Sequence, residues 1–173
     1  MILSTLCYIE KDGKYLMLHR TKKKNDINKD KWLGIGGKFE KNESPEECII
    51  REVKEETGLI LQSYKLRCIV TYVSTTWEEE YIYVFTSNDF TGELIECNEG
   101  DLQWIDKNKV TELNTWEGDK IFVEKIKNDN TFFTVKFEYD EEKFHTRRLC
   151  NAATVFCCIS EYSLHCREFH CSL

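Results

Sequence analysis

The chain has 173 residues, enough for one domain with a substantial buried core. Its formal net charge is −7 and its pI is about 5.2, which argues against broad electrostatic binding to nucleic acid or to an anionic membrane. The high aromatic content and the single proline argue against a disordered chain.

The first nine residues contain no basic segment and only a short apolar run. We therefore expect neither a signal peptide nor a membrane span, and a cytoplasmic location is the default expectation. In a reducing compartment, four cysteines of the domain are expected to be free thiols that are mostly buried: Cys7, Cys48, Cys68 and Cys97.

Two strands are predicted at residues 2–9 and 14–20, because both runs are rich in apolar and aromatic residues. Asp12-Gly13 suits the turn between them. His19 lies near the end of the second strand, and we interpret it as structural rather than catalytic.

A polar, basic loop follows at residues 21–31. It is either a solvated loop or a segment that helps to hold phosphates, and the solvated interpretation is favoured. Residues 32–38 then contain three glycines, which let the backbone approach a ligand closely. Trp32 in this stretch is expected to pack rather than to stack on a base.

A helix is predicted from about residue 45 to residue 57. Ser44 is a suitable N-cap, Pro45 fits the first helical position, and Glu47 completes a capping box. Gly58 suits the position just after the helix end.

Residues on this helix separate into arcs at 100° per residue. Glu52, Glu55 and Glu56 share one arc, where the three carboxylates repel one another. A hard divalent cation such as Mg²⁺ makes such a cluster favourable, whereas the alternative interpretation is a solvated acidic face. The core side is predicted to carry Ile49, Ile50, Val53 and Thr57.

The segment from Gly37 to Leu59 reads GKFEKNESPEECIIREVKEETGL. The spacing of its glycines, glutamates and arginine resembles the Nudix box, and every fixed position of that pattern is filled. The resemblance implies a Nudix hydrolase with an α/β fold, an α/β/α sandwich around a mixed central sheet. Such an enzyme cleaves a nucleoside diphosphate linked to another group, with Mg²⁺ or Mn²⁺ as cofactor.

The same resemblance assigns roles within the site. Arg51 is expected to orient the glutamates through an ion pair to Glu43 or Glu55. The general base is expected to be Glu52, with Glu99 outside the motif as the other candidate. The implied metal ligands are Glu52, Glu55, Glu56 and the carbonyl of Gly37.

Further elements are predicted after the motif: strands at 65–75, 81–87 and 102–105, a helix near 119–127 and a strand at 131–139. The loop at 76–80 is predicted to be a hairpin with solvent-facing glutamates. Tyr72, Tyr81 and Tyr83 line either a pocket or the core, and the core is favoured.

The order of EGDLQW at 99–104 and NTWEGDKIF at 114–122 resembles the MutT-like 8-oxo-dGTP diphosphatases of the family. The resemblance implies that Trp116 stacks on a purine and that Asp119 binds the base edge; the alternative is a helix start with a packed tryptophan. Lys38 and Leu33 are grouped with them as substrate-binding residues. Leu33 stands where related enzymes often carry asparagine, and Gly118 stands where they commonly carry a second acid.

The Nudix domain is placed at residues 1–148, and residues 149–173 form a tail rich in cysteine and histidine. The tail spacing fits no standard zinc pattern, so an appended or non-native extension is favoured over a metal-binding tail. The candidate ligands in it are Cys150, Cys157, Cys158, His165, Cys166, His170 and Cys171.

The expected function is hydrolysis of oxidised purine nucleoside triphosphates to a nucleoside monophosphate and pyrophosphate. One alternative is a Nudix hydrolase of a nucleotide sugar, a dinucleoside polyphosphate or an RNA 5′ end. Another is a non-catalytic module that binds nucleotide. The expected partner is a small-molecule nucleotide, with no stable nucleic-acid complex and no membrane, and the protein is expected to be a monomer or a homodimer.

Overall fold

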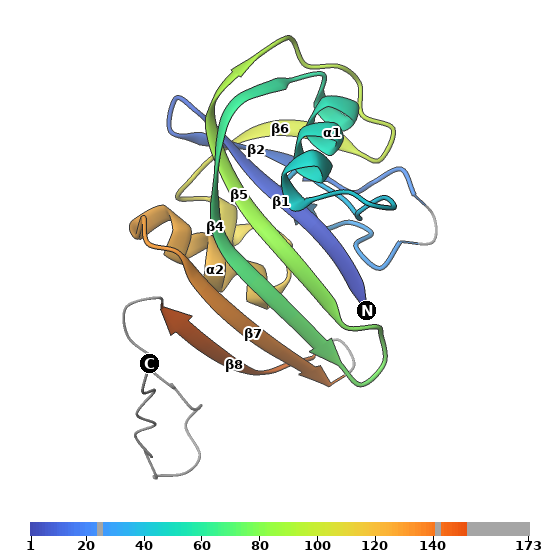
Figure 1. Cartoon of the computed structure of the whole chain (residues 1–173), viewed down its shortest axis with the longest axis vertical. Coiled ribbons are helices and arrows are strands. Elements are labelled where there is room, and N and C mark those ends of the chain that lie inside the picture. Colours follow the sequence, from blue (N-terminus) through green and yellow to red (C-terminus); the bar gives the residue numbers. More distant parts are fainter. Residues whose placement is uncertain (24–25, 141–142, 152–173) are drawn as a thin grey trace.

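The computed structural model describes residues 1–23, 26–140 and 143–151, which form an eight-stranded sheet and two helices (Figure 1). The strand order is β3-β2-β1-β5-β4-β7-β8, and β6 pairs with β2 outside this path. The elements in chain order are β1 (Ile2–Lys11), β2 (Lys14–His19), β3 (Trp32–Leu33), α1 (Pro45–Thr57), β4 (Ile60–Ser74), β5 (Glu80–Thr91), β6 (Asp101–Asp106), a 3₁₀ turn (Val110–Glu112), α2 (Glu117–Asn128), β7 (Phe133–Asp140) and β8 (Lys143–Asn151).

The sheet is mixed and lies between the two helices. The pairs β1–β5 and β4–β7 are parallel, whereas β1–β2 and β4–β5 are antiparallel. Alternate residues of one strand point to opposite faces: Cys7 and Ile9 of β1 pack in the core that contains α1, and Tyr8 packs in the core that contains Phe122 of α2. The predicted α/β/α sandwich with a mixed central sheet is therefore confirmed.

Helix α1 has the predicted bounds and the predicted caps. The Ser44 side chain accepts from the Glu47 N–H, the Glu47 side chain accepts from the Ser44 N–H, and Gly58 ends the helix with φ of 77°. The predicted core side is wrong at Ile50, which is 39% exposed. Compared with the predicted arc, the buried arc of α1 is rotated toward Cys48 and the acidic residues. The acidic side of the helix therefore packs against the rest of the domain.

Several strands are longer than the sequence indicates, and two were missed, the short β3 and β8. The strands β4 and β5 extend to Ile60 and Thr91, past the predicted ends. The longer missed strand, β8, pairs antiparallel with β7 at the sheet edge. Its sequence, KFHTRRLCN, is mostly polar, as is common for an edge strand, and so gives no clear apolar alternation.

The proposed domain boundary at residue 148 falls within β8, and the rest of the tail, residues 152–173, lies outside the described residues. Of the tail cysteines and histidines, only the backbone of Cys150 is described. Cys7, Cys48, Cys68 and Cys97 are buried free thiols, as predicted. Within the described ranges, no helix has the length and apolar character needed to cross a membrane.

Candidate functional site

A cleft of about 630 Å³ gathers residues that lie far apart in the sequence. It is lined by β1, the loop after β2, the glycine-rich stretch, α1, the β4–β5 hairpin and the start of α2. Eight of the predicted site residues line it: Leu33, Gly37, Lys38, Arg51, Glu52, Glu99, Trp116 and Asp119. The remaining three, Glu43, Glu55 and Glu56, contact these residues or their neighbours.

The glycine-rich turn lies directly against the acidic arc of α1. The Gly36 N–H donates to Oε2 of Glu56 at 3.0 Å. A Cβ added to Gly37 would lie 2.5 Å from Oε1 of Glu52, so the backbone there leaves no room for a side chain. The turn and the two carboxylates therefore form one packed unit, because glycine lets the backbone approach them.

Arg51 connects the carboxylates around this unit. Its guanidinium forms two hydrogen bonds to Glu43, at 2.6 and 2.9 Å, and contacts Glu52 at 2.8 Å and Glu55 at 3.2 Å. It also donates to the carbonyl of Lys38. Hydrogen bonds from Arg51 lower the pKa of Glu43 to about 2. Both ion pairs expected for Arg51 are present.

Two carboxylates in this region carry raised pKa values. Burial raises the pKa of Glu56 to about 8; the Gly36 N–H acts in the opposite direction, and the charges of Glu99 and Glu52 add to the rise. Burial is also the largest cause of the raised pKa of Glu52. Negative charge in this part of the cleft is therefore unfavourable unless a cation balances it.

The donor set at this end fits a hard divalent cation. Carboxylates of Glu52 and Glu56 lie beside the backbone of Gly36 and Gly37, and oxygen is the ligand atom that Mg²⁺ prefers. Glu55 differs, since its side chain is 61% exposed and contacts Arg51. Among the described residues, no group of three or more acidic, histidine or cysteine side chains is already arranged to hold a metal ion.

Glu99 comes from the loop before β6 and reaches the same end of the cleft. It forms ion pairs with Arg20 and Lys23. Glu99 lines the same cleft as Glu52, and its charge raises the pKa of both Glu52 and Glu56. Because residues of the 21–31 loop also line the cleft, this loop is part of the site, and the favoured interpretation as a merely solvated loop was incomplete.

Trp116 and Asp119, both from the start of α2, form a second group of cleft residues, which we treat as the other end of the cleft. The Trp116 indole N–H donates to Asn28 at 2.8 Å, and the Lys31 ammonium lies 4.3 Å from the indole ring. Asp119 is 4% exposed and accepts from the hydroxyl of Tyr72 at 2.5 Å. Trp116 and Asp119 are three residues apart at the start of α2, so the sequence order places an aromatic side chain and a buried carboxyl on the same part of the cleft wall.

The β4–β5 hairpin also contributes to this end, which the sequence analysis missed. Trp77 lines the cleft with its ring centroid 5.7 Å from that of Trp116. Glu80 also lines it, and the prediction that the hairpin glutamates face solvent is wrong for this residue. Tyr72 lies both in the core and on the cleft wall. The sequence of a hairpin loop alone does not show that its side chains line a cleft, because this depends on how the hairpin packs against the rest of the fold.

The buried carboxyl of Asp119 makes stability depend on pH. Burial raises its pKa to about 6; Tyr72, Thr115 and Lys31 act to lower the pKa, whereas Glu80 raises it. Between pH 4 and 6 the folded state then holds a proton that the unfolded state has lost, so the free energy of unfolding falls as the pH rises through this window.

Asp119→Asn should remove this dependence, because an amide carries no charge to bury. We expect the variant to match the wild type near pH 4 and to be more stable at pH 7, by on the order of 3 kcal/mol for a shift of about two pKa units. Urea unfolding at pH 4, 5, 6 and 7 measures this, with Asp89→Asn, a change at an exposed position, as the control. A stability difference that stays constant with pH would contradict the assignment.

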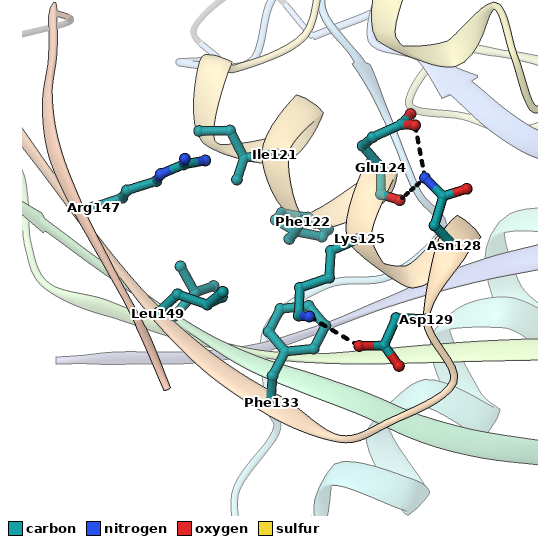
Figure 2. A pocket seen from close by; sticks show the side chains of 10 residues that line it. Ile121, Phe122, Glu124, Lys125, Asn128, Asp129, Phe133, Arg147 and Leu149 are labelled. Carbon is teal, nitrogen blue, oxygen red and sulfur yellow. Dashed lines mark hydrogen bonds and ion pairs between the residues drawn. The ribbon is translucent and has the colours of Figure 1, made fainter. Parts of the chain in front are cut away.

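A smaller cavity, of about 370 Å³, lies between α2 and the strands β7 and β8 (Figure 2). Lys125 pairs with Asp129 at 3.0 Å and Glu124 accepts from Asn128 at 2.8 Å within this cavity. The cavity contains none of the predicted site residues, and its lining is largely apolar. Its lining residues are Ile121, Phe122, Glu124, Lys125, Asn128, Asp129, Phe133, Val135, Arg147 and Leu149.

Comparisons with known proteins agree with this geometry. The NUDIX domain family model matches residues 3–126. The chain is 31% identical over 120 residues to the uncharacterized Nudix hydrolase YvcI of Bacillus subtilis (strain 168), covering 66% of this chain and 72% of the relative. It is 30% identical over 118 residues to the oxidized purine nucleoside triphosphate hydrolase of Danio rerio, covering 68% and 74%.

A solved structure is also similar over most of its length. The MutT protein from Bacillus halodurans superposes with a TM-score of 0.77 at 26% identity, covering 86% of this chain and 97% of that chain. Family match, fold and the packed glycine–glutamate unit agree, so the chain belongs to the Nudix family and is a MutT-like Nudix hydrolase that acts on phosphoric anhydride bonds.

Proposed function

We propose that this hydrolase acts on purine nucleoside triphosphates, with oxidised purines such as that of 8-oxo-dGTP as the preferred bases, and releases a nucleoside monophosphate and pyrophosphate. One observation carries the proposal: a single cleft is lined by Gly36, Gly37 and Glu52 of the glycine–glutamate unit and also by Trp116 and Asp119. The activity in the name of the Danio rerio relative supports the same class of substrate.

The phosphate end is assigned to the acidic arc. A bound Mg²⁺ or Mn²⁺ supplies charge neutralisation and Lewis acidity there. Glu52, Glu55, Glu56 and the Gly37 carbonyl would hold it. Of these, Glu55 must leave its contact with Arg51 or bind from its exposed position. Lys38, which also lines the cleft, is assigned to the phosphates by its charge.

The chemical step is displacement at phosphorus. A water attacks the phosphorus, the bond to the bridging oxygen breaks, and pyrophosphate leaves. Glu52 is the proposed base that takes the proton of this water, since its carboxylate lies against the glycine-rich turn and is held there by Arg51. Arg51 is a positioning residue that holds Glu52, and Glu99, held by Arg20, is the other candidate base.

The base end is assigned to the tryptophan and the buried acid. Trp116 offers a large aromatic surface for stacking, and Asp119 offers acceptor oxygens to N–H groups on the base edge. Leu33 contributes an apolar side chain to the cleft wall. It stands at the position where related enzymes often carry an asparagine, whose amide would bind the base. The pKa of Asp119 is about 6, so below this pH its protonated carboxyl group can also donate a hydrogen bond to the base.

A substrate panel tests the proposal directly. Purified protein with Mg²⁺ is given dGTP, 8-oxo-dGTP, 2-hydroxy-dATP, dATP, ADP-ribose and a diadenosine polyphosphate, and the phosphate-containing products are identified. A preference for an oxidised purine triphosphate, with pyrophosphate as product, supports the proposal. Preference for ADP-ribose or a dinucleoside polyphosphate would support the hydrolase activity but assign a different substrate. Absence of metal-dependent turnover on all of them would favour a nucleotide-binding module.

Trp116→Ala should weaken binding of a purine without altering the phosphate end. Loss of one stacking partner is expected to lower kcat/KM about 10- to 100-fold. Most of the change should appear in KM, because stacking acts on ground state and transition state alike. The matched control is Trp104→Ala, which removes a tryptophan that packs on Phe90 outside the cleft. Equal effects of both variants would contradict the stacking role.

A further inference from the structure

The proposed base end contains a second carboxylate, that of Glu80. Glu80 is the first residue of β5, where it lies opposite Tyr72 of β4 in the antiparallel pairing. Directly opposite residues of paired strands share a face, so Glu80 lies on the side of Tyr72 that carries the hydroxyl bound to Asp119. Both carboxylates line the cleft.

A hydroxyl from the neighbouring strand holds Glu80 in place. Ser4 of β1 is 5% exposed, and its Oγ donates to Oε1 of Glu80 at 2.6 Å. The pairing of β1 with β5 sets Ile2 beside Glu80, and Ser4 is two residues further on the same face. Tyr72 links the two acids, since it lies opposite Glu80 in the strand pairing and donates to Asp119, and the charge of Glu80 raises the pKa of Asp119.

The start of α2 has no room for another acidic side chain at Gly118. A Cβ there would lie 2.8 Å from the Tyr72 hydroxyl oxygen and 3.0 Å from that of Tyr139. The Gly118 N–H is itself bound to the Tyr139 hydroxyl at 2.9 Å. The second carboxylate at this part of the cleft therefore does not come from the start of α2; it is Glu80, from the β4–β5 hairpin.

Two neighbouring carboxylates favour one kind of base edge. A guanine-type edge presents two adjacent donors, the ring N–H and the exocyclic amine, and each needs an acceptor. An adenine-type edge presents one donor beside one acceptor, so one carboxylate facing it is left without a donor. Each carboxylate keeps its protein hydrogen bonds, from Ser4 to Glu80 and from Tyr72 and Thr115 to Asp119, but a carboxylate oxygen that faces the acceptor of an adenine-type edge is repelled and loses its contact with water.

We propose that Glu80 is a specificity-determining residue that accepts, together with Asp119, the two N–H donors of a guanine-type base and disfavours adenine-type bases. This inference rests on the proposed function, because it concerns the base end of the same cleft. It names the substrate class as guanine nucleotides and their oxidised forms.

Binding of nucleoside monophosphates without metal tests the inference apart from catalysis. Calorimetric titrations at pH 7.5 compare dGMP, 8-oxo-dGMP and dAMP on the wild type, Glu80→Gln and Glu79→Gln. Glu79 is the adjacent exposed hairpin residue, so its variant carries the same charge change away from the cleft. Thermal unfolding confirms that each variant is folded.

We expect Glu80→Gln to lose about 10- to 100-fold in affinity for dGMP and 8-oxo-dGMP, while dAMP binding stays equal or improves. Ser4→Ala should change the selectivity in the same direction by a smaller factor, and Glu79→Gln should leave it unchanged. Unchanged selectivity in Glu80→Gln, with guanine binding by the wild type intact, would overturn the role of Glu80 alone. Failure of the wild type to bind any of the purines would overturn the proposed function, and this inference with it.

Discussion

Glu56→Gln is expected to lower kcat for metal-dependent hydrolysis by about a thousandfold. Glu56 is the most buried carboxylate of the acidic arc and lies against the glycine-rich turn. A divalent cation held at this end would stabilise the transition state by several kcal/mol, and loss of about 4 kcal/mol corresponds to about a thousandfold in rate. Pyrophosphate release over a range of Mg²⁺ concentrations measures the loss.

The fold should survive this change. The amide oxygen of glutamine can still accept from the Gly36 N–H, and the neutral side chain carries no charge to bury. We therefore expect a melting temperature at or above that of the metal-free wild type. Glu46→Gln is the control, since Glu46 lies on the exposed first turn of the same helix. Full activity in Glu56→Gln would remove Glu56 from the metal assignment, and a similar loss in Glu46→Gln would point to a general charge effect.

The acidic arc could be predicted because its determinants are local. Ser44, Pro45 and Gly58 set the helix bounds within a few residues of chain, and helical spacing alone places Glu52 beside Glu56. The rotation of the helix was not predictable in the same way. Ile50 is exposed and Cys48 buried because the acidic side packs against the glycine-rich turn, a contact between segments that the helix pattern does not contain.

The base end contains residues that local sequence patterns do not predict. Trp116 and Asp119 are recognisable from their order in the chain, whereas Glu80 depends on the register between β1 and β5 and on the turn that brings the β4–β5 hairpin over the cleft. Neighbouring Glu79 looks the same in sequence and is exposed. Strand β8 was missed for a related reason, since an edge strand needs few apolar residues.

Gly36→Ala should damage both stability and activity. Gly36 has φ of 154°, and an added Cβ would lie 2.1 Å from the carbonyl oxygen of Thr5, which is backbone and cannot turn aside. We expect a loss of at least about 3 kcal/mol in the free energy of unfolding and a fall of roughly 10 °C in Tm. Since Gly36 also donates to Glu56, hydrolysis should fall in the fraction that still folds.

Gly13→Ala separates backbone strain from steric collision as causes of the loss of stability expected for Gly36→Ala. Gly13 also has a positive φ, 74°, but a Cβ there meets nothing within 4 Å, so the substitution carries backbone strain without a collision. It should cost only about 1–2 kcal/mol and leave kcat unchanged, because the turn between β1 and β2 lies outside the cleft lining. Denaturant unfolding and pyrophosphate release, measured on both variants, decide the matter. Equal losses of stability would show that the close approach of Gly36 to β1 does not position the glycine-rich turn. A larger loss of stability in Gly36→Ala, together with lost activity, would show that the geometry of the glycine-rich turn holds the carboxylates in place.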